Sequence, residues 1–344
     1  MIRGPCLALL LMGATCAITT ARAASPTLTD VTLVQSSQSF NFVPLYIAQT
    51  QGYFAQEGLK VEVILAGGGP KAMTALVGGG GQFSASVLFD GIMAHRRGLD
   101  EVRAIATLSY FLKPLVIRAD VAKARHISRD VPLKPRLAAM KGLRVAITTP
   151  GASSDMLLRY LFINNGMQPD RDLQIVPLGG VASQLAGLQA GQVDACSCLP
   201  GVDIVTNREG LTIDLLNSDD MQALDGVTYG TLYGLASYMK AHPEVIRGMA
   251  RAMARADLLI AHDSAAAGRA TRPFFKEMDD ATYNASWRTY APYFPTDPDI
   301  SRAGFAKELA LEKTVLPPSA AAAVPYDAVV DTAAVRAAMH ELAP

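Results

Sequence analysis

The chain lacks the short motifs that mark common hydrolases, metalloproteases and phosphate-binding loops. It has no Gly-x-Ser-x-Gly, no His-Glu-x-x-His and no glycine-rich loop that ends in Gly-Lys-Ser or Gly-Lys-Thr. The segment 67–71 has the glycines of such a loop, but Pro70 has no backbone N–H to offer a phosphate. The five histidines are scattered and form no metal set or catalytic triad. The sequence therefore gives no positive evidence for catalysis, a metal or a cofactor.

Charge is also scarce and balanced. The 31 basic and 31 acidic residues cancel, and charged residues make up 18% of the chain against 50% hydrophobic ones. This composition is typical of a globular protein and offers no basic surface for nucleic acid or anionic lipid. A chain of 344 residues is too long for one small core, so we expect two lobes or domains.

The first 23 residues have the three parts of a secretory signal peptide. Arg3 gives a positive start, residues 7–18 form an apolar core, and Ala21-Arg22-Ala23 is a small-x-small cleavage site. The apolar run is shorter than the roughly 20 residues that span a bilayer. We therefore expect a cleaved leader and a soluble periplasmic product.

Two cysteines remain after the predicted leader is removed. Cys196 and Cys198 are separated by one residue, which would strain a disulfide between them. No second cysteine or histidine pair completes a metal set. We expect both to be buried thiols in a strand.

Short β-branched runs alternate with helix-length segments in two successive sets, which predicts βαβ units around parallel sheets. In the first set we expect strands at 31–34, 61–65, 83–87 and 102–108, and helices at 42–48, 71–77 and 90–97. In the second we expect strands at 143–147, 173–176 and 193–198, and helices at 154–164 and 182–189. Further helices, from Pro243 onward and at 279–290, 300–314 and 332–342, are expected to pack around the first lobe.

The two sets share a local signature. Gly81-Gln82-Phe83-Ser84-Ala85 matches Gly191-Gln192-Val193-Asp194-Ala195, and a Gly-Gly pair precedes each, at 68–69 and 179–180. The same order in both halves predicts two similar α/β lobes.

Two segments, 110–114 and 225–230, lie between the sets and after them. We interpret them as crossings between the lobes. This divides the chain into a discontinuous first lobe, residues 24–112 and 229–344, and a second lobe, residues 113–228.

The stretch from Thr148 to Asp155 joins a strand, a glycine turn and a helix that begins with serines. The first N–H groups of a helix lack partners inside it and lie at the positive end of its dipole, so they can bind an acceptor atom. An ordinary helix cap is the alternative interpretation.

Four stretches resemble one known family. The run 43–61, the Pro-Gly-Ala-Ser-Ser turn at 150–154, the segment 191–195 and Ala241-His242-Pro243-Glu244 are similar, in this order, to ABC-transporter substrate-binding proteins. The group concerned is the nitrate/sulfonate/taurine and thiamine-precursor family.

The resemblance implies an α/β, two-lobed periplasmic-binding-protein type II fold with two crossing segments and a ligand cleft between the lobes. It further implies a monomer that closes on a small molecule and delivers it to an ABC permease with its ATPase subunit. The cleft would be lined by Ser37, Gln38, Phe40 and Asn41 with Tyr46 behind them, by Ser86, Phe89 and Asp90, by Ala152, Ser153 and Ser154, by Leu199, Pro200 and Asp203, and at the rim by Tyr110 and Tyr229.

Several of these residues have an alternative structural role. Phe40 is also placed to pack against the following helix, and Ser86 and Asp203 are placed to cap helices. Asp155, directly after the serines, would oppose a strong anion if it faced inward, unless it caps its own helix. We therefore expect an organic ligand: a sulfonate, an aromatic carboxylate or a pyrimidine-like molecule.

Two other functions are compatible with the same fold. Thiamine-pyrimidine synthases share it and use a cysteine-rich segment, which Cys196-Ser197-Cys198 resembles faintly. A sensor subunit that presents its ligand to a receptor would also use lobe closure.

Overall fold

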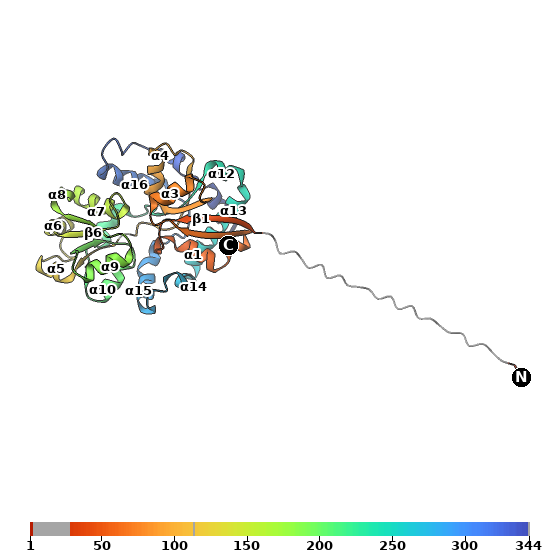
Figure 1. The fold of residues 1–344 in the computed structure, drawn as a ribbon, viewed down its shortest axis with the longest axis horizontal. Helices are drawn as coiled ribbons and strands as arrows, with labels where there is room; N and C mark the ends of the chain where they lie inside the picture. The colour runs from red at the N-terminus through yellow and green to blue at the C-terminus, as the bar shows by residue number, and fades with distance from the viewer. Residues whose placement is uncertain (3–27, 113, 343–344) are drawn as a thin grey trace.

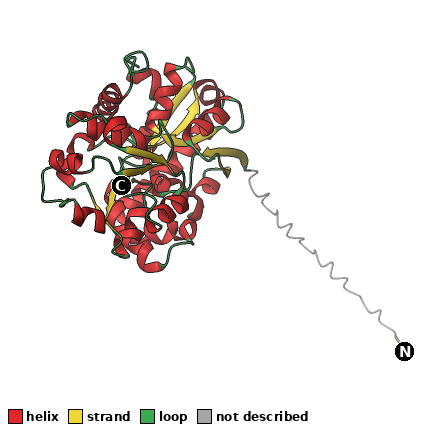
Figure 2. Cartoon of the chain, turned by 60° about the vertical axis from the view of Figure 1, so that its left-hand side comes forward, coloured by secondary structure: helices red, strands yellow, loops and turns green. Residues whose placement is uncertain are grey.

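The computed structural model describes residues 1–2, 28–112 and 114–342, so the core and cleavage site of the predicted signal peptide lie outside the described residues. Two five-stranded sheets lie side by side, each surrounded by helices (Figure 1, Figure 2). The first sheet takes its strands from residues 29–107 and 230–235, and the second from residues 115–214. The predicted α/β class with two similar parts is confirmed. In the part of the chain that the structure describes, no helix is both long and apolar enough to span a bilayer.

The first sheet has a parallel half and an antiparallel half. In spatial order its strands are β2 (Leu59–Leu65), β1 (Thr29–Gln35), β3 (Phe83–Val87), β10 (Gly230–Leu235) and β4 (Val102–Thr107). β1 runs parallel to β2 and β3, whereas β10 runs antiparallel to β3 and β4. The parallel strands agree with the sequence prediction, but β10 was missed.

The second sheet repeats this plan. In spatial order its strands are β7 (Gln174–Pro177), β6 (Arg144–Ile147), β8 (Ala195–Ser197), β5 (Leu115–Arg118) and β9 (Thr212–Asp214). β6 pairs in parallel with β7 and β8, and β5 is antiparallel to β8 and β9. The shared signature is explained, because β3 and β8 occupy the same place in their sheets.

Helices cover both sheets. Around the second sheet lie α5 (Ala119–Ala124), α6 (Leu133–Ala139), α7 (Ser153–Asn164), α8 (Pro169–Asp172), α9 (Val181–Gln189), α10 (Val202–Arg208) and α11 (Ser218–Met221). The remaining helices are α1 (Val43–Thr50), α2 (Tyr53–Gln56), α3 (Gly69–Val77), α4 (Leu88–Arg96), α12 (Ala236–Ala241), α13 (Pro243–His262), α14 (Ser264–Thr271), α15 (Asp280–Tyr290), α16 (Arg302–Val315), α17 (Tyr326–Val329) and α18 (Ala333–Leu342). Short 3-10 turns occur at Phe40–Phe42, Gln222–Leu224, Arg272–Phe275 and Ala291–Tyr293.

The sequence predicted that the C-terminal helices pack around the first lobe. The structure shows that this prediction is wrong for two of them. α13 and α18 pack together beside the first sheet. By contrast α15 contacts α10, where the Tyr290 hydroxyl donates to Asp203, and α16 packs on α7 through an apolar cluster that includes Leu311 and Leu158. These two helices therefore touch both halves of the molecule.

The segments predicted as crossings connect the sheets. The first leads from β4 to β5 and the second from β9 to β10, and they pair with each other at a bridge between Tyr110 and Thr228. The backbone N–H of Tyr229 donates to the Ser109 carbonyl at 2.8 Å. Both crossings therefore run together between the sheets.

Candidate ligand-binding site

A cavity of about 420 Å³ lies between the two sheets. The ends of all six parallel strands, β1, β2, β3, β6, β7 and β8, lead into its wall. Its lining residues are Ser36, Ser37, Asn41, Phe42, Leu65, Gly67, Gly68, Gly69, Pro70, Ser86, Val87, Asp90, Thr148, Thr149, Pro150, Gly151, Ala152, Ser153, Gly179, Gly180, Leu199 and Tyr229. Small ligands bind at the carboxyl ends of parallel strands in open α/β sheets, which makes this cavity the candidate site.

Three helices begin at the wall of the cavity without a side-chain cap. The N-cap positions of α3, α7 and α9 are Gly68, Ala152 and Gly180, and none of them provides a side-chain hydrogen bond. The first N–H groups of α7 and α9, and that of Gly69 in α3, are therefore available to an acceptor in the cavity, whereas Pro70 in the first turn of α3 has no N–H. The alternative interpretation of this stretch, in which a serine caps α7, is wrong, because the N-cap is Ala152.

The two serines at the start of α7 have different surroundings. Ser153 lines the cavity, and its Oγ hydrogen-bonds the Tyr229 hydroxyl from the second crossing. Ser154 is fully buried, where its Oγ accepts from the Thr148 N–H at 3.0 Å and contacts Thr148 Oγ1 at 2.7 Å. Ser154 therefore supports the turn from behind, and only Ser153 faces the cavity.

Asp90 is the one charged residue that lines the cavity among the described residues. Its Oδ2 accepts from the Ser86 hydroxyl and, at 3.4 Å, from the Val87 N–H, so Asp90 holds the first turn of α4. Burial raises the pKa of Asp90 to about 6, although the Ser86 hydrogen bond acts in the opposite direction. A Cβ on Gly69 would lie 2.0 Å from Asp90 Oδ2, so only glycine fits beside this carboxylate.

Asp155 does not take part in the cavity wall. It is 3% exposed, accepts from the Gly151 N–H at 2.8 Å, and is paired with Arg159 Nε at 2.8 Å one helical turn later. The sequence argument that Asp155 would oppose an anion therefore does not apply, since Asp90 is the carboxylate at the cavity.

A model of the NMT1-like family matches residues 37–272, more than half of the chain. The chain belongs to the NMT1-like family.

Solved structures show that this NMT1-like chain has the periplasmic-binding-protein fold. A Bordetella bronchiseptica protein is similar with a TM-score of 0.77 and 23% identity, over 91% of this chain and 97% of that one. The alkanesulfonate-binding protein SsuA of Xanthomonas axonopodis, bound to MOPS, is similar with a TM-score of 0.66 and 18% identity, over 86% and 96%. Among curated proteins, YtlA of Bacillus subtilis, named as a binding protein, is 23% identical over 80% of this chain and 74% of its own length.

The cavity brings together seven of the fifteen predicted site residues of the NMT1-like chain. These are Ser37, Asn41, Ser86, Asp90, Ala152, Ser153 and Tyr229, and Leu199 joins them.

The other eight lie elsewhere. Phe40 is fully buried and stacks on Phe275 with ring centroids 4.0 Å apart, so it belongs to the core. Tyr46 lies behind the loop as expected, where its hydroxyl accepts from the Ser39 N–H at 3.1 Å. Gln38 is exposed and donates to the Phe274 carbonyl, Ser154 and Pro200 are buried outside the wall, and Phe89 packs in a small neighbouring pocket.

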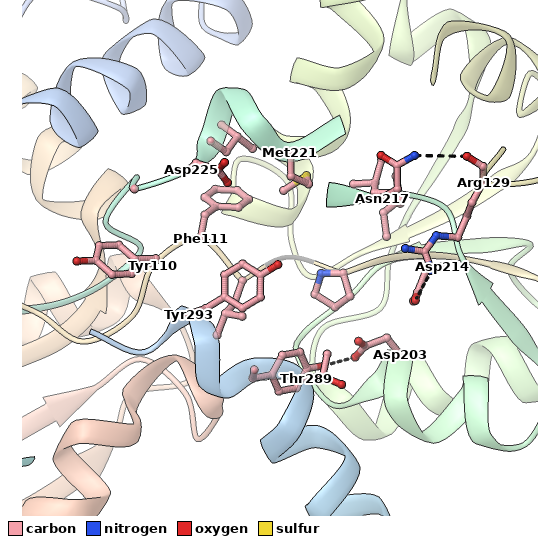
Figure 3. Close-up of a pocket in the computed structure, with 17 residues that line it drawn as sticks. Tyr110, Phe111, Arg129, Asp203, Asp214, Asn217, Met221, Asp225, Thr289 and Tyr293 are labelled. Atoms are coloured by element: carbon pink, nitrogen blue, oxygen red, sulfur yellow. Dashed lines mark hydrogen bonds and ion pairs between the residues drawn. The ribbon is translucent and has the colours of Figure 1, made fainter. Parts of the chain in front are cut away.

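Tyr110 and Asp203 line a different cavity, of about 340 Å³, which shares no lining residue with the first (Figure 3). Its wall comes from the crossings, from α15 and from the second sheet, where Arg129 lies 3.7 Å from Asp214. Burial raises the pKa of Asp203 to about 6, against the hydrogen bond from Tyr290. Among the described residues, no helix of eight or more residues begins at the wall of this second cavity without a side-chain cap. The second cavity therefore lacks the free backbone N–H donors of the first.

The loop before α3 and the Gly179-Gly180 pair were missed as wall residues. Both Gly-Gly pairs were visible in the sequence as part of the repeat. The matching positions of β3 and β8 place the two pairs at the starts of α3 and α9, on opposite walls of the cavity. The repeated Gly-Gly pairs in the sequence therefore indicated where the cavity lies.

Proposed function

We propose that this protein is the solute-binding component of an ABC importer and that it acts in the periplasm after residues 1–23 are removed. Residues 24–112 with 229–344 form one lobe and residues 113–228 the other. The lobes close on a small organic solute, and closure is the signal that the permease with its ATPase subunit recognises. The observation that carries the proposal is the convergence of six parallel strand ends and three uncapped helix starts on one cavity.

Relatives support this role. A sulfonate-binding protein and the nitrate-binding protein NrtA of Synechocystis share the fold, the latter with a TM-score of 0.66 and 15% identity over 93% of this chain and 90% of that one. The bicarbonate-binding protein CmpA of Synechococcus elongatus is 25% identical over 46% of this chain and 38% of its own length.

The wall of the cavity favours an organic solute. Hydroxyl and amide groups alternate with apolar side chains such as Phe42, Leu65 and Leu199. No lysine, arginine or histidine lines the cavity in the described part of the chain, so a bare inorganic anion would find only neutral hydroxyl, amide and backbone donors there. Sulfonates, aromatic carboxylates and pyrimidine-like molecules present both an apolar body and polar groups, which this wall accommodates.

The alternative of a thiamine-pyrimidine synthase receives no support from the cysteines. Cys196 and Cys198 are buried in an apolar cluster with Val116 and Ala146, away from the cavity wall.

Native mass spectrometry of the exported protein, followed by calorimetric titration with these three classes and with nitrate, sulfate and bicarbonate, tests the proposal. We expect an organic solute to bind. Ser153→Asp adds negative charge at the start of α7 and should weaken binding of an acceptor ligand about tenfold or more. Ser319→Asp, at an exposed position outside the cavity, is the matched control.

Binding of the inorganic anions alone, or an unchanged affinity in Ser153→Asp, would contradict the proposal. A deletion strain that still takes up the bound solute at the normal rate would contradict the importer role and favour a sensor subunit.

A further inference from the structure

The ligand cavity shares part of its wall with a much smaller pocket. This small pocket, of about 10 Å³, lies between α16, the starts of α7 and α4, and the second crossing. Val87, Ser153 and Tyr229 line both spaces, whereas Glu308 of α16 lines only the small pocket. A volume of about 10 Å³ is close to what one water molecule needs. The Ser153–Tyr229 pair therefore separates Glu308 from the ligand cavity.

Glu308 is a buried acid without a protein partner. The residue is 5% exposed, and no hydrogen bond or ion pair of its carboxyl group is found among the described residues. The nearby cation, Arg96, pairs with Glu312 at 2.5 Å instead. Buried polar groups in folded proteins are nearly always hydrogen-bonded, to water where no protein group is available. The small pocket gives the Glu308 carboxyl group room for one such water beside the hydroxyl groups of Ser153 and Tyr229.

The Tyr229 hydroxyl is placed to transmit the protonation state of Glu308. Burial raises the pKa of Tyr229 above its ordinary value, although the hydrogen bond with Ser153 acts in the opposite direction, so the hydroxyl keeps its proton. A hydroxyl group has one proton to donate and lone pairs that accept. In the hydrogen bond between Ser153 and Tyr229 either residue can be the donor. The direction of this hydrogen bond is therefore set by what lies on either side of the pair.

We propose that Glu308 is a positioning residue that acts through one water and through Tyr229. It determines whether Ser153 offers the solute a donor or an acceptor. When Glu308 is protonated, its O–H donates to the water, the water to Tyr229 and Tyr229 to Ser153, which leaves the Ser153 proton for an acceptor on the solute. When Glu308 is ionised, it accepts from the water, the chain reverses, and Ser153 donates to Tyr229 instead. This inference rests on the proposed function, because it concerns how the same cavity holds its solute.

The ionisable groups around Glu308 come from α16, α4 and β10. Burial raises the pKa of Glu308 to about 8, repulsion by Glu312 adds to the rise, and attraction by Arg96 opposes it. Burial also raises the pKa of Glu312 to about 7 and that of Asp90 to about 6, so both ionise at lower pH than Glu308. Tyr233 keeps its proton, because burial raises its pKa as well. The residues that α7 contributes to the small pocket carry no charge. The effect of Glu308 on the solute should therefore appear above pH 7.

Calorimetric titration at pH 7, 8, 8.5 and 9.5 tests the proposal with ethanesulfonate, benzoate and pyrimidine. Each probe has an acceptor group, and none gains or loses a proton in this range. The wild-type affinity for a probe that binds should fall about five- to tenfold from pH 7 to pH 9.5, which is the size of one lost hydrogen bond. Titration in two buffers of different ionisation enthalpy should show uptake of about half a proton on binding at pH 8.5. Circular dichroism checks that the protein is folded at each pH.

Three variants test the chain of hydrogen bonds. Glu308→Gln keeps an N–H donor at every pH, so its affinity should change by less than about twofold between pH 7 and 9.5. Tyr229→Phe leaves the Ser153 proton to the solute and should bind at both pH values about as tightly as wild type at pH 7. Ser153→Ala has no proton to offer and should bind at both about as weakly as wild type at pH 9.5. Glu62→Gln, the same change as Glu308→Gln at an exposed position on β2, is the matched control and should keep the wild-type profile.

The outcomes separate the inference from the proposed function. A flat wild-type profile for a probe that binds, or a pH dependence that persists in Glu308→Gln or in Tyr229→Phe, overturns the inference and leaves the binding role intact. If none of the three probes binds, the organic solute that copurifies with the protein is titrated in the same way. Binding of no organic solute at any pH contradicts the proposed function itself.

Discussion

Glu308 gives a prediction about stability and pH. It lies on α16, is 5% exposed, and borders the small pocket between α16, Tyr229 and Ser153. The nearby cation, Arg96, pairs with Glu312 one turn later instead: Arg96 Nη1 lies 2.5 Å from Glu312 Oε2. Burial raises the pKa of Glu308 to about 8, with repulsion by Glu312 as the next cause. Glu308 is therefore protonated in the folded protein at neutral pH.

The sign of the pH dependence follows from this shift. In the unfolded chain the pKa of Glu308 is near 4.5, so between pH 4.5 and 8 the folded state binds more protons than the unfolded state. Stability is thus lost as pH rises through this window. A difference of 3.5 pKa units corresponds to about 5 kcal/mol. Because local rearrangement and water entry lower such penalties, we expect Glu308→Gln to be about 2–4 kcal/mol more stable than wild type at pH 9.

Urea unfolding of wild type and Glu308→Gln at pH 5, 6, 7, 8 and 9 checks this prediction. The two curves should coincide within about 1 kcal/mol at pH 5 and separate as pH rises. Glu62→Gln, at an exposed position on β2, should follow wild type at every pH. A wild-type curve that stays parallel to that of Glu308→Gln from pH 5 to 9 would refute the reasoning.

Two further predictions concern tightly packed positions in the interior. Arg136 is 2% exposed and pairs with Asp220 at 2.9 Å, so Arg136→Met should cost about 3–5 kcal/mol in urea unfolding, and the double variant with Asp220→Asn should recover part of that loss. A Cβ on Gly91 would lie 2.4 Å from Cε1 of the fully buried Tyr233, so Gly91→Ala should lower stability by about 1–3 kcal/mol despite its better helix propensity. A single variant as stable as wild type would contradict the corresponding packing argument.

The sequence predicted those elements whose pattern is set by the local chain. The parallel strands and their following helices were found within a few residues, because β-branched runs and helical spacing depend on neighbours in sequence. β5, β9 and β10 were missed. They are antiparallel strands of three to six residues. Each pairs with a strand that lies far away in the sequence, as β10 does with β3 and β5 with β8.

The sequence predicted which loops line the cavity, but not which of their side chains face it. Ser153 and Ser154 are adjacent in the sequence, yet about 100° of helix rotation separates them, and only the first faces the cavity. In the same way Asp90 faces the ligand cavity while Asp155 is paired with Arg159. The phase of each helix is fixed by packing across the molecule, which one sequence does not reveal.

The position of β10 has a consequence for the order of folding. β10 lies between β3 and β4 in the first sheet, but it follows β4 by more than a hundred residues that belong to the second sheet. The second sheet is continuous in the chain and can be completed as soon as residue 214 is available. Until residues 230–235 arrive, β3 and β4 each expose an unpaired edge, and a contact of such high sequence separation forms slowly. The first sheet is therefore the last to close, although its first strand is the first to be synthesised.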